Sequence, residues 1–595
     1  MNEEAIFHVN MENFVYPIAR NELVFQIRVA KQDIAACDIV YWNRDDGIKK
    51  CERLGCAIRD KLYDYYRGKV KFKQVARYQK YYFILKDTVG HQQYYSTIGI
   101  TDYEPTEYAF EYLYANGNDV IHYPDWTKGT VYYQIFPERF FNGDTANDPK
   151  ECMEWGTAPT RENYMGGDLK GIQMKIPYLK ELGIECIYLN PIFCSDFNHK
   201  YATSNYFKVD PIFGTNEDFR ELVDKCHDNG IKVVLDGVFN HTGIHISFFE
   251  DLLENQSNSK YAKWYLTEKE KIDVSEKDYE CVGAYKWMPK LNTANKEVRE
   301  FVIKVMDYWI SEYQIDGWRL DVADEVDSTV WQMARRVLKD RYPEIILIGE
   351  TWGYGGTLVT ANRLDSVMNY MFRDAVWDYF GKNRIDVEEF DQRINHMLAM
   401  YKEETMQVMY NLIDSHDTER FLYICKENKE LYKLAIAFQI LFIGSPAIYY
   451  GDEVGQTGAN DPDCRRCMIW DEAADIHLKK YYQQYIDIRR RHDCIRKGTF
   501  RTVLADNRTD TYAFVRSSDM EDIYVLIHKG GIEENIKCPV LQQGEYEDCI
   551  TQHKYVAEPK EKVMYNGDIA EYQGVIPVNM PAYSVKVISH LKEEN

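Results

Sequence analysis

The chain has 595 residues, more than one hydrophobic core usually supports, so we expect about two to four domains. Its 45% hydrophobic and 28% charged residues are typical of a folded soluble protein. The net charge of −23 excludes non-specific binding to nucleic acid or to an anionic membrane, because such binding requires clustered Lys and Arg.

No membrane span and no export signal are predicted. The most apolar stretch begins at Leu434 and is interrupted by Gln439, Ser445 and Pro446, so a buried helix followed by a strand fits it better than a membrane span. The first residues lack the basic segment and apolar run of a secretory signal. Fourteen cysteines without a regular framework suit reduced thiols, and we expect a cytoplasmic protein.

Residues 1–122 have the pattern of an antiparallel β-sandwich. Leu23, Phe25, Ile27 and Val29 occur at every second position, which predicts a strand with one buried face. The whole chain has 48 tyrosines. Their rings can pack in the core or stack on flat apolar surfaces of a ligand, and composition alone favours packing in the core. A stretch rich in Gly, Asn, Pro and Asp follows and is predicted to be a linker.

In residues 123–500, short apolar strands alternate with amphipathic helices, which predicts a central (β/α)8 barrel. A small additional domain is expected after the third strand, at about residues 242–292. Antiparallel strand patterns return in residues 501–595 and predict a C-terminal β-sandwich. The expected fold class is therefore multidomain α/β, with a barrel between two β-domains.

Ionisable residues follow several of the predicted barrel strands, always at the carboxyl end. A random scatter would place about half of them at the other end, and internal ion pairs, the alternative explanation, would not require this regularity. Because active sites of such barrels form at the carboxyl ends of the strands, we predict an active site there. The residues are Asp236, His241, Arg319, Asp321, Glu350, His416 and Asp417.

Four motifs, "DGVFNH", "GWRLDVADE", "GETW" and "DSHDTER", resemble in this order the signature regions of the α-amylase superfamily, glycoside hydrolase family 13. "MPKLN", "YQIFPERFFNGD", "GGDLKGI" and "NDPDCRR" are similar to segments of its cyclomaltodextrinase, neopullulanase and maltogenic amylase branch. The resemblance covers nearly the whole chain. It implies retaining hydrolysis of α-1,4-glucosidic bonds in cyclodextrins, pullulan or maltooligosaccharides, accompanied in some members by transglycosylation.

Cleaving a glycosidic bond builds positive charge at the anomeric carbon and negative charge on the leaving oxygen, so one carboxylate and one carboxylic acid are needed. The resemblance implies that Asp321 is the nucleophile, Glu350 the general acid/base and Asp417 the stabiliser of the transition state. Arg319 precedes Asp321 by two residues, so both side chains point to one face of a strand. We expect the guanidinium to lower the pKa of Asp321 and keep it ionised.

The resemblance also implies sugar-binding residues around the three acids. His241 and His416 would hydrogen-bond sugar hydroxyls, Tyr201 would stack under the scissile sugar, and Trp352 would offer a platform on the leaving-group side. Taken singly, the histidines are as well explained by structural roles and the rings by core packing. The full predicted set is His199, Tyr201, Asp236, His241, Arg319, Glu325, Trp352, His416, Asp461 and Arg465.

A loop rich in hard oxygen donors precedes the first predicted barrel helix, a composition that suits Ca²⁺. The resemblance implies a structural calcium site, and an ordinary polar loop is the alternative. The ligands would be Asn142, Asp144, Asn147, Asp148, Gly166 and Asp168. No His or Cys pair has the spacing of zinc ligands, and no organic cofactor is expected.

Two other functions remain open at this point. A glucanotransferase or isomerase of the same family would pass the glycosyl group to a sugar instead of water. A non-catalytic carbohydrate-binding protein on this fold would usually lack one or more of the three acids, and all three are present. The chain departs from the family at Ala202, Asn205, Asp324 and Cys467, which leaves substrate preference open. The resemblance further implies a homodimer formed through the N-terminal domain.

Overall fold

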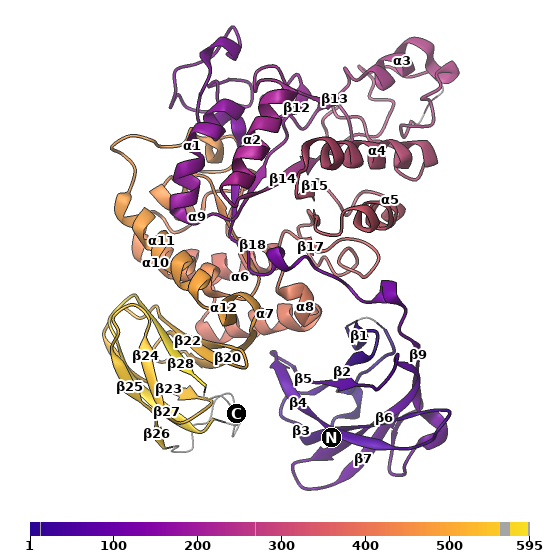
Figure 1. The fold of residues 1–595 in the computed structure, drawn as a ribbon, viewed down its shortest axis with the longest axis vertical. Coiled ribbons are helices and arrows are strands. Elements are labelled where there is room, and N and C mark those ends of the chain that lie inside the picture. Colours follow the sequence, from indigo (N-terminus) through magenta and orange to yellow (C-terminus); the bar gives the residue numbers. More distant parts are fainter. Residues whose placement is uncertain (12, 268, 270, 560–571, 593–595) are drawn as a thin grey trace.

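The computed structural model describes residues 1–11, 13–267, 269, 271–559 and 572–592. Figure 1 shows a barrel of strands and helices with two β-domains packed against it, one from each end of the chain. The predicted fold class, a (β/α)8 barrel between two antiparallel β-domains, is confirmed. In the described part of the chain, no helix combines the length and apolarity needed to cross a membrane.

The N-terminal domain is a set of nine antiparallel strands. They are β1 (Val15–Ala19), β2 (Glu22–Ala30), β3 (Ile34–Asn43), β4 (Lys50–Arg59), β5 (Tyr63–Lys71), β6 (Arg77–Asp87), β7 (Gln92–Ser96), β8 (Gly99–Thr101) and β9 (Phe110–Tyr114). The predicted strand is β2, but the prediction of one buried face is wrong, because Val24 and Gln26 on its other face are also buried. Gln26 is satisfied there by the Asn13 carbonyl and by Arg67.

The barrel strands are parallel and almost entirely buried, as expected for a sheet covered on both faces. They are β10 (Tyr132–Ile135), β11 (Cys186–Leu189), β14 (Lys232–Gly237), β15 (Gly317–Leu320), β16 (Ile346–Gly349), β17 (Ser366–Val367), β18 (Tyr410–Leu412) and β19 (Ser445–Tyr449). Hydrogen-bonded neighbours run from β17 through β10 to β18, and a parallel bridge between Met368 and Tyr410 joins the two ends into a closed ring.

Helices surround this ring. The main ones are α1 (Leu169–Leu182), α2 (Asn216–Asp228), α4 (Lys296–Tyr313), α5 (Ser328–Ala334), α6 (Tyr370–Val376), α7 (Val387–Met400), α10 (Lys429–Leu441) and α11 (Ile476–Arg491). Shorter ones are α3 (Ser247–Asn255), α8 (Glu403–Met406), α9 (Phe421–Ile424) and α12 (Asp493–Lys497). Local sequence sets the helix ends. For example, the N-cap of α2 is Thr215, which forms a capping box with Asp218.

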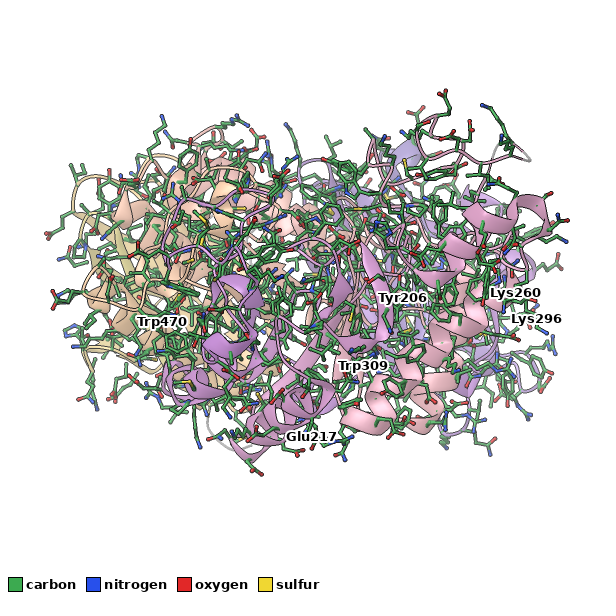
Figure 2. All side chains as sticks on the ribbon, turned by 90° about the horizontal axis from the view of Figure 1, so that it is seen from above. Tyr206, Glu217, Lys260, Lys296, Trp309 and Trp470 are labelled. Atoms are coloured by element: carbon green, nitrogen blue, oxygen red, sulfur yellow. The ribbon has the colours of Figure 1, made fainter. Side chains whose placement is uncertain are left out.

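Two excursions from the barrel shape the region above the strand ends. After β11 the chain forms a hairpin, β12 (Phe193–Ser195) and β13 (Thr203–Val209), which the sequence analysis did not anticipate. Trp309 of α4 holds this hairpin by donating a hydrogen bond from Nε1 to the Tyr206 carbonyl at 2.8 Å, and the two residues lie together in Figure 2. The second excursion, between β14 and α4, contains α3 and few other regular elements.

The C-terminal domain is built from two antiparallel sheets. Its strands are β20 (Thr499–Asp506), β21 (Thr511–Ser517), β22 (Glu521–His528), β23 (Glu534–Val540), β24 (Glu545–Asp548), β25 (Lys554–Val556), β26 (Glu558–Pro559), β27 (Gly574–Met580) and β28 (Ser584–Leu591).

Helix α7 contacts both β-domains. His396 Nδ1 lies 3.2 Å from Asp60 Oδ2 in the N-terminal domain, and Thr502 of β20 donates a hydrogen bond to Asp391 at 2.7 Å. Ile58 and Tyr65 of the N-terminal domain belong to the same continuous hydrophobic core as the barrel. The three domains are therefore packed as one unit.

Candidate active site

The guanidinium of Arg319 lies among three carboxylates at the carboxyl ends of β14, β15 and β16. Its Nη1 is 3.0 Å from Asp236 Oδ1 and 2.7 Å from Asp321 Oδ1. Its Nη2 is 2.8 Å from Glu350 Oε2. All four side chains are buried. The two predicted acids, Asp321 and Glu350, therefore face each other across one cation, and negative groups outnumber positive ones.

Burial dominates the electrostatics of this cluster. It raises the pKa of Asp321 well above the ordinary value, the Arg319 guanidinium lowers it, and Glu350 and Asp236 raise it further. The expected effect of Arg319 is thus present, but the expectation of a net lowering is wrong, because desolvation and two neighbouring carboxylates outweigh one guanidinium. Burial likewise raises the pKa of Asp236, against the lowering by Arg319.

Glu350 is held by two donors. The Val322 N–H donates to Oε2 at 2.9 Å, and Trp352 Nε1 donates to Oε1 at 3.0 Å. Val322 adopts φ 45°, a left-handed conformation that is costly for a β-branched residue and often marks functional sites. Trp352 stacks on Tyr370 with ring centroids 4.5 Å apart and is 52% exposed, so one face of its ring is open to a ligand.

A hydrogen-bond chain fixes His416. The Gln134 amide donates to Nδ1 at 2.7 Å, which leaves the proton of the neutral ring on Nε2. Nε2 lies 2.6 Å from Tyr201 Oη and 3.1 Å from Asp417 Oδ2. Tyr201 in turn donates to Asp236 at 2.9 Å. Burial, with the positive charges of Arg465 and Arg319, lowers the pKa of His416 well below its usual value, so the ring is neutral.

His199 and Tyr201 lie on the loop between β12 and β13. The ring of Tyr201 is nearly parallel to that of His416, with centroids 5.4 Å apart, and the ring of His199 lies 5.9 Å from that of Tyr201. Burial and Arg465 lower the pKa of His199 to about 3. The three rings thus lie next to one another, and Tyr201 joins them to Asp236.

Asp417 and Asp461 are joined by Arg465. Arg465 Nη2 is 3.2 Å from Asp417 Oδ1, and its Nη1 is 2.9 Å from Asp461 Oδ1. Its Nε also donates to the His416 carbonyl at 2.8 Å. Asp417 is more open than Asp321 and Glu350, and reaches the cluster through His416.

Two further predicted residues, His241 and Glu325, differ in burial. His241 is buried in the segment that follows β14, and burial lowers its pKa to about 4. Glu325 is exposed on the rim, where Lys290 pairs with it at 2.6 Å. Glu325 is thus linked to the excursion before α4 and not to Arg319.

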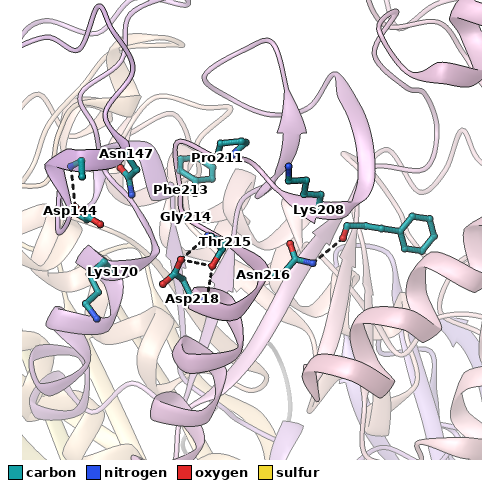
Figure 3. A pocket seen from close by; sticks show the side chains of 12 residues that line it. Asp144, Asn147, Lys170, Lys208, Pro211, Phe213, Gly214, Thr215, Asn216 and Asp218 are labelled. Carbon is teal, nitrogen blue, oxygen red and sulfur yellow. Dashed lines mark hydrogen bonds between the residues drawn. The ribbon is translucent and has the colours of Figure 1, made fainter.

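The candidate calcium loop precedes α1. The side-chain oxygens Oδ1 of Asn142 and Asn147 are buried without a hydrogen-bond partner among the described residues, which is unusual for buried amides. Gly166 adopts φ +80°, and a Cβ there would come within 2.4 Å of Asn142 Nδ2 and of Asp148 Oδ1. Figure 3 shows Asp144 and Asn147 at one edge of an open pocket of about 750 Å³.

Asp168 has a second role that the sequence analysis missed. Its carboxylate caps α1 by accepting from the Gly171 N–H at 2.6 Å, and it also accepts from the Asp144 N–H at 2.8 Å. Across the described ranges, no group of three or more His, Cys, Asp or Glu side chains could hold a metal ion. A cation would therefore depend on amide and carbonyl oxygens as well, and the two unpaired amide oxygens fit that requirement.

Four residues of the site were not predicted: Gln134, Tyr188, Asn190 and Tyr370. Tyr188 donates to Asp236 at 2.6 Å, and Asn190 donates to Tyr201 at 2.9 Å. A usable signal existed, since Gln134 and Asn190 are amides within or directly after apolar barrel strands.

A closed parallel barrel that holds two carboxylates close together at its strand ends has the arrangement that a glycoside hydrolase requires. The family model described as the alpha amylase catalytic domain matches residues 134–498, and that of the alpha amylase N-terminal ig-like domain matches residues 1–116. The chain belongs to the α-amylase family.

The relatives align with this chain over nearly its whole length. A cyclomaltodextrinase of Thermoanaerobacter pseudethanolicus is 42% identical, over 90% of this chain and 94% of the relative. Neopullulanase 2 of Thermoactinomyces vulgaris is 38% identical, over 92% and 95%. A solved cyclomaltodextrinase structure superposes with a TM-score of 0.92 at 34% identity, covering 99% of this chain and 100% of that one.

Proposed function

We propose that the protein hydrolyses α-1,4-glucosidic bonds of cyclodextrins, pullulan or maltooligosaccharides, with retention of configuration. The observation that carries the proposal is the placement of Asp321 and Glu350 on two nitrogens of one buried guanidinium. The names of the relatives, cyclomaltodextrinase and neopullulanase, support the substrate class.

In the proposed reaction, Asp321 attacks the anomeric carbon and Glu350 protonates the leaving oxygen, which gives a covalent glycosyl-enzyme. Glu350 then takes a proton from the water that releases the sugar. Asp417, which is open to the site and oriented by Arg465, stabilises the positive charge on the sugar ring.

The remaining residues would bind the sugar. The neighbouring rings of His199, Tyr201 and His416 would supply flat surfaces beside the scissile sugar, and Trp352 would supply one next to the acid/base. Asp461 and Arg465 would hold the next sugar. His241, Asp236 and Glu325 are the other proposed sugar-binding residues.

Single substitutions test the roles. Asp321→Asn, Glu350→Gln and Asp417→Asn should each lower kcat with maltotriose by about 10³-fold or more. Asp316→Asn is the matched control. Asp316 lies just before the amino end of β15, away from the carboxyl end that carries the acids, and pairs with Lys232 at 2.8 Å. A variant of the three that keeps wild-type turnover would remove that residue from the mechanism.

Product analysis separates hydrolysis from the alternative, a glucanotransferase. Hydrolysis of maltotriose gives only shorter sugars, whereas transfer gives products longer than the substrate. Proton NMR of the first products should show the α-anomer; an initial β-anomer would disprove retention.

We also propose a structural Ca²⁺ at the loop of Asn142, Asp144, Asn147, Asp148, Gly166 and Asp168. The support is the pair of unpaired buried amide oxygens on Asn142 and Asn147. Chelation should lower the thermal midpoint, and added Ca²⁺, but not Mg²⁺, should restore it. Asn147→Ala should abolish this response. A midpoint that chelation leaves unchanged would argue for an ordinary polar loop.

We further propose a cytoplasmic homodimer that associates through the N-terminal domain. Cys37, Cys186 and Cys538 are buried thiols that are not bridged to one another, which suits a reducing compartment. Sedimentation of the full chain tests the dimer, and a single monomeric species at micromolar concentration would contradict it.

A further inference from the structure

Four polar side chains of the active site form a closed ring of hydrogen bonds. The Gln134 amide nitrogen lies 2.9 Å from Asn190 Oδ1 and 2.7 Å from His416 Nδ1. The Tyr201 hydroxyl closes the ring, 2.9 Å from Asn190 Nδ2 and 2.6 Å from His416 Nε2. Gln134, Asn190 and His416 are buried, so losing one member would leave buried polar atoms unpaired, which is costly.

The number of protons fixes the direction of this ring. The Tyr201 hydroxyl also lies 2.9 Å from Asp236 Oδ2, a carboxylate oxygen that accepts. When the Gln134 nitrogen donates to both neighbours, each neighbour presents an N–H to the hydroxyl oxygen of Tyr201. The hydroxyl proton then goes to Asp236, and every contact has one donor and one acceptor. In the opposite direction, Asn190 Oδ1, His416 Nε2 and Asp236 Oδ2 would all face that single proton, and two of them would stay unpaired.

This direction matters for Asp417, because it decides which atom of His416 faces the carboxylate. Nε2 of His416 lies 3.1 Å from Asp417 Oδ2, and Arg465 Nη2 lies 3.2 Å from the other oxygen, Oδ1. With its proton on Nε2, the imidazole presents an N–H to one oxygen of Asp417 while the guanidinium holds the other. With its proton on Nδ1, the lone pair of Nε2 would face the carboxylate, and the contact would become repulsive.

We propose that Gln134 and Asn190 are positioning residues, which set the tautomer of His416 and through it the orientation of Asp417. This inference deepens the proposed hydrolytic function and rests on it. Asp417 acts on the positive charge that the sugar ring develops in the transition state, so disturbing its orientation should lower kcat more than it raises KM. The two amides thus contribute to catalysis through their neighbours in the ring.

Kinetics of Gln134→Met test the role, because methionine has a similar length and cannot donate. We expect kcat with maltotriose to fall by about ten-fold, with a much smaller change in KM. Gln439→Met is the matched control: Gln439 of α10 is buried and also donates two hydrogen bonds, to the carbonyls of Asn411 and Ala447. It should lower the thermal midpoint by a similar amount and keep kcat. Wild-type kcat in Gln134→Met, or an equal loss in both variants, would overturn the proposal.

Gln134→Glu provides a readout that packing alone would not move, since the two side chains have the same shape. Once ionised, the introduced carboxyl group can only accept, and the proton of His416 should move to Nδ1. The ratio of kcat in the variant to kcat in the wild type should therefore fall as pH rises from about 5 to 8. A ratio independent of pH would contradict the proposed role of Gln134.

The tautomer itself can be measured in the full-length protein, whether or not it is active. Its histidine rings would be labelled with ¹⁵N, and the signals of His416 assigned in solid-state spectra at about pH 8 by comparison with His416→Asn. We expect the proton on Nε2 in the wild type and on Nδ1 in Gln134→Glu. A wild-type proton on Nδ1 would refute the inference. If the wild type cleaves none of the proposed glucans, the proposed function fails, while the spectra still decide the tautomer.

Discussion

Arg319 holds the carboxylates of the site together, because two of its nitrogens contact three acids at 3.0 Å or less. Lysine cannot reproduce this fork. Arg319→Lys should therefore lower kcat/KM by about 10²-fold or more, measured with maltotriose.

A matched substitution separates this effect from the general cost of replacing a buried arginine. Arg335→Lys alters another ion pair, with Asp365 at 2.8 Å, outside the active site. It should keep near-normal turnover. Equal turnover in the two variants would show that the planar fork at Arg319 is unnecessary.

The raised pKa of Asp321 sets the acid side of the pH profile. Asp321 must be ionised to attack, and burial shifts its protonation to higher pH than for an ordinary aspartate. As pH falls, kcat/KM should therefore begin to decline well above about pH 4, the usual aspartate range. A rate that stays constant down to about pH 4 would contradict a raised pKa in the working enzyme.

The residues found from sequence are those whose chemistry is needed at a strand end: Asp321, Glu350 and Asp417 all stand where expected. Gln134 and Tyr188 were missed because they lie within strands whose other residues are apolar, and period-based reading assigns such positions to the core. The partner of each polar strand residue is decided when the barrel closes and brings distant strands together. Local sequence carries no information about those contacts.

At the scale of single elements, α7 links the domains through an ion pair that depends on pH. The hydrogen bond from His396 to Asp60 raises the pKa of His396, and despite burial the pKa of Asp60 is lowered. The pair is therefore lost when pH rises through the His396 pKa or falls through that of Asp60. Its contribution is fully present between about pH 4 and 6.5.

His396→Gln tests this link. The thermal midpoint of the variant should be lower than that of the wild type near pH 6, and the difference should vanish near pH 9. The effect is below about 1 kcal/mol, since the imidazole is half exposed. His91→Gln, a pair on the open surface, is the control and should show no such trend. A difference independent of pH would mean that His396 acts through packing alone.

Long, strongly periodic elements such as α1 and α2 were predictable, because their apolar spacing and capping residues are local signals. The hairpin of β12 and β13 was not. β12 has three residues, too few for a period, and the hairpin is stabilised by distant contacts such as that of Trp309 with the Tyr206 carbonyl.

At the scale of the whole molecule, the N-terminal domain is integral to the barrel. Ile58 and Tyr65 share the barrel's hydrophobic core, and Arg67 Nη1 lies 3.6 Å from Oε2 of Glu403, the first residue of α8. A chain of residues 123–595 would expose that apolar seam, so it should melt at a lower temperature and bind an apolar dye. Calorimetry of the truncated and full chains gives the comparison, and equal midpoints would show that the barrel is independent.

The crowding of three acids around a single guanidinium has a consequence for inhibitors. The single guanidinium does not balance the three carboxylates, and a sugar-like ring that carries a protonated nitrogen would supply the missing positive charge. Amine-containing sugar mimics should consequently be retained more tightly than neutral glucose analogues of the same shape, with the advantage fading once the basic nitrogen is acylated.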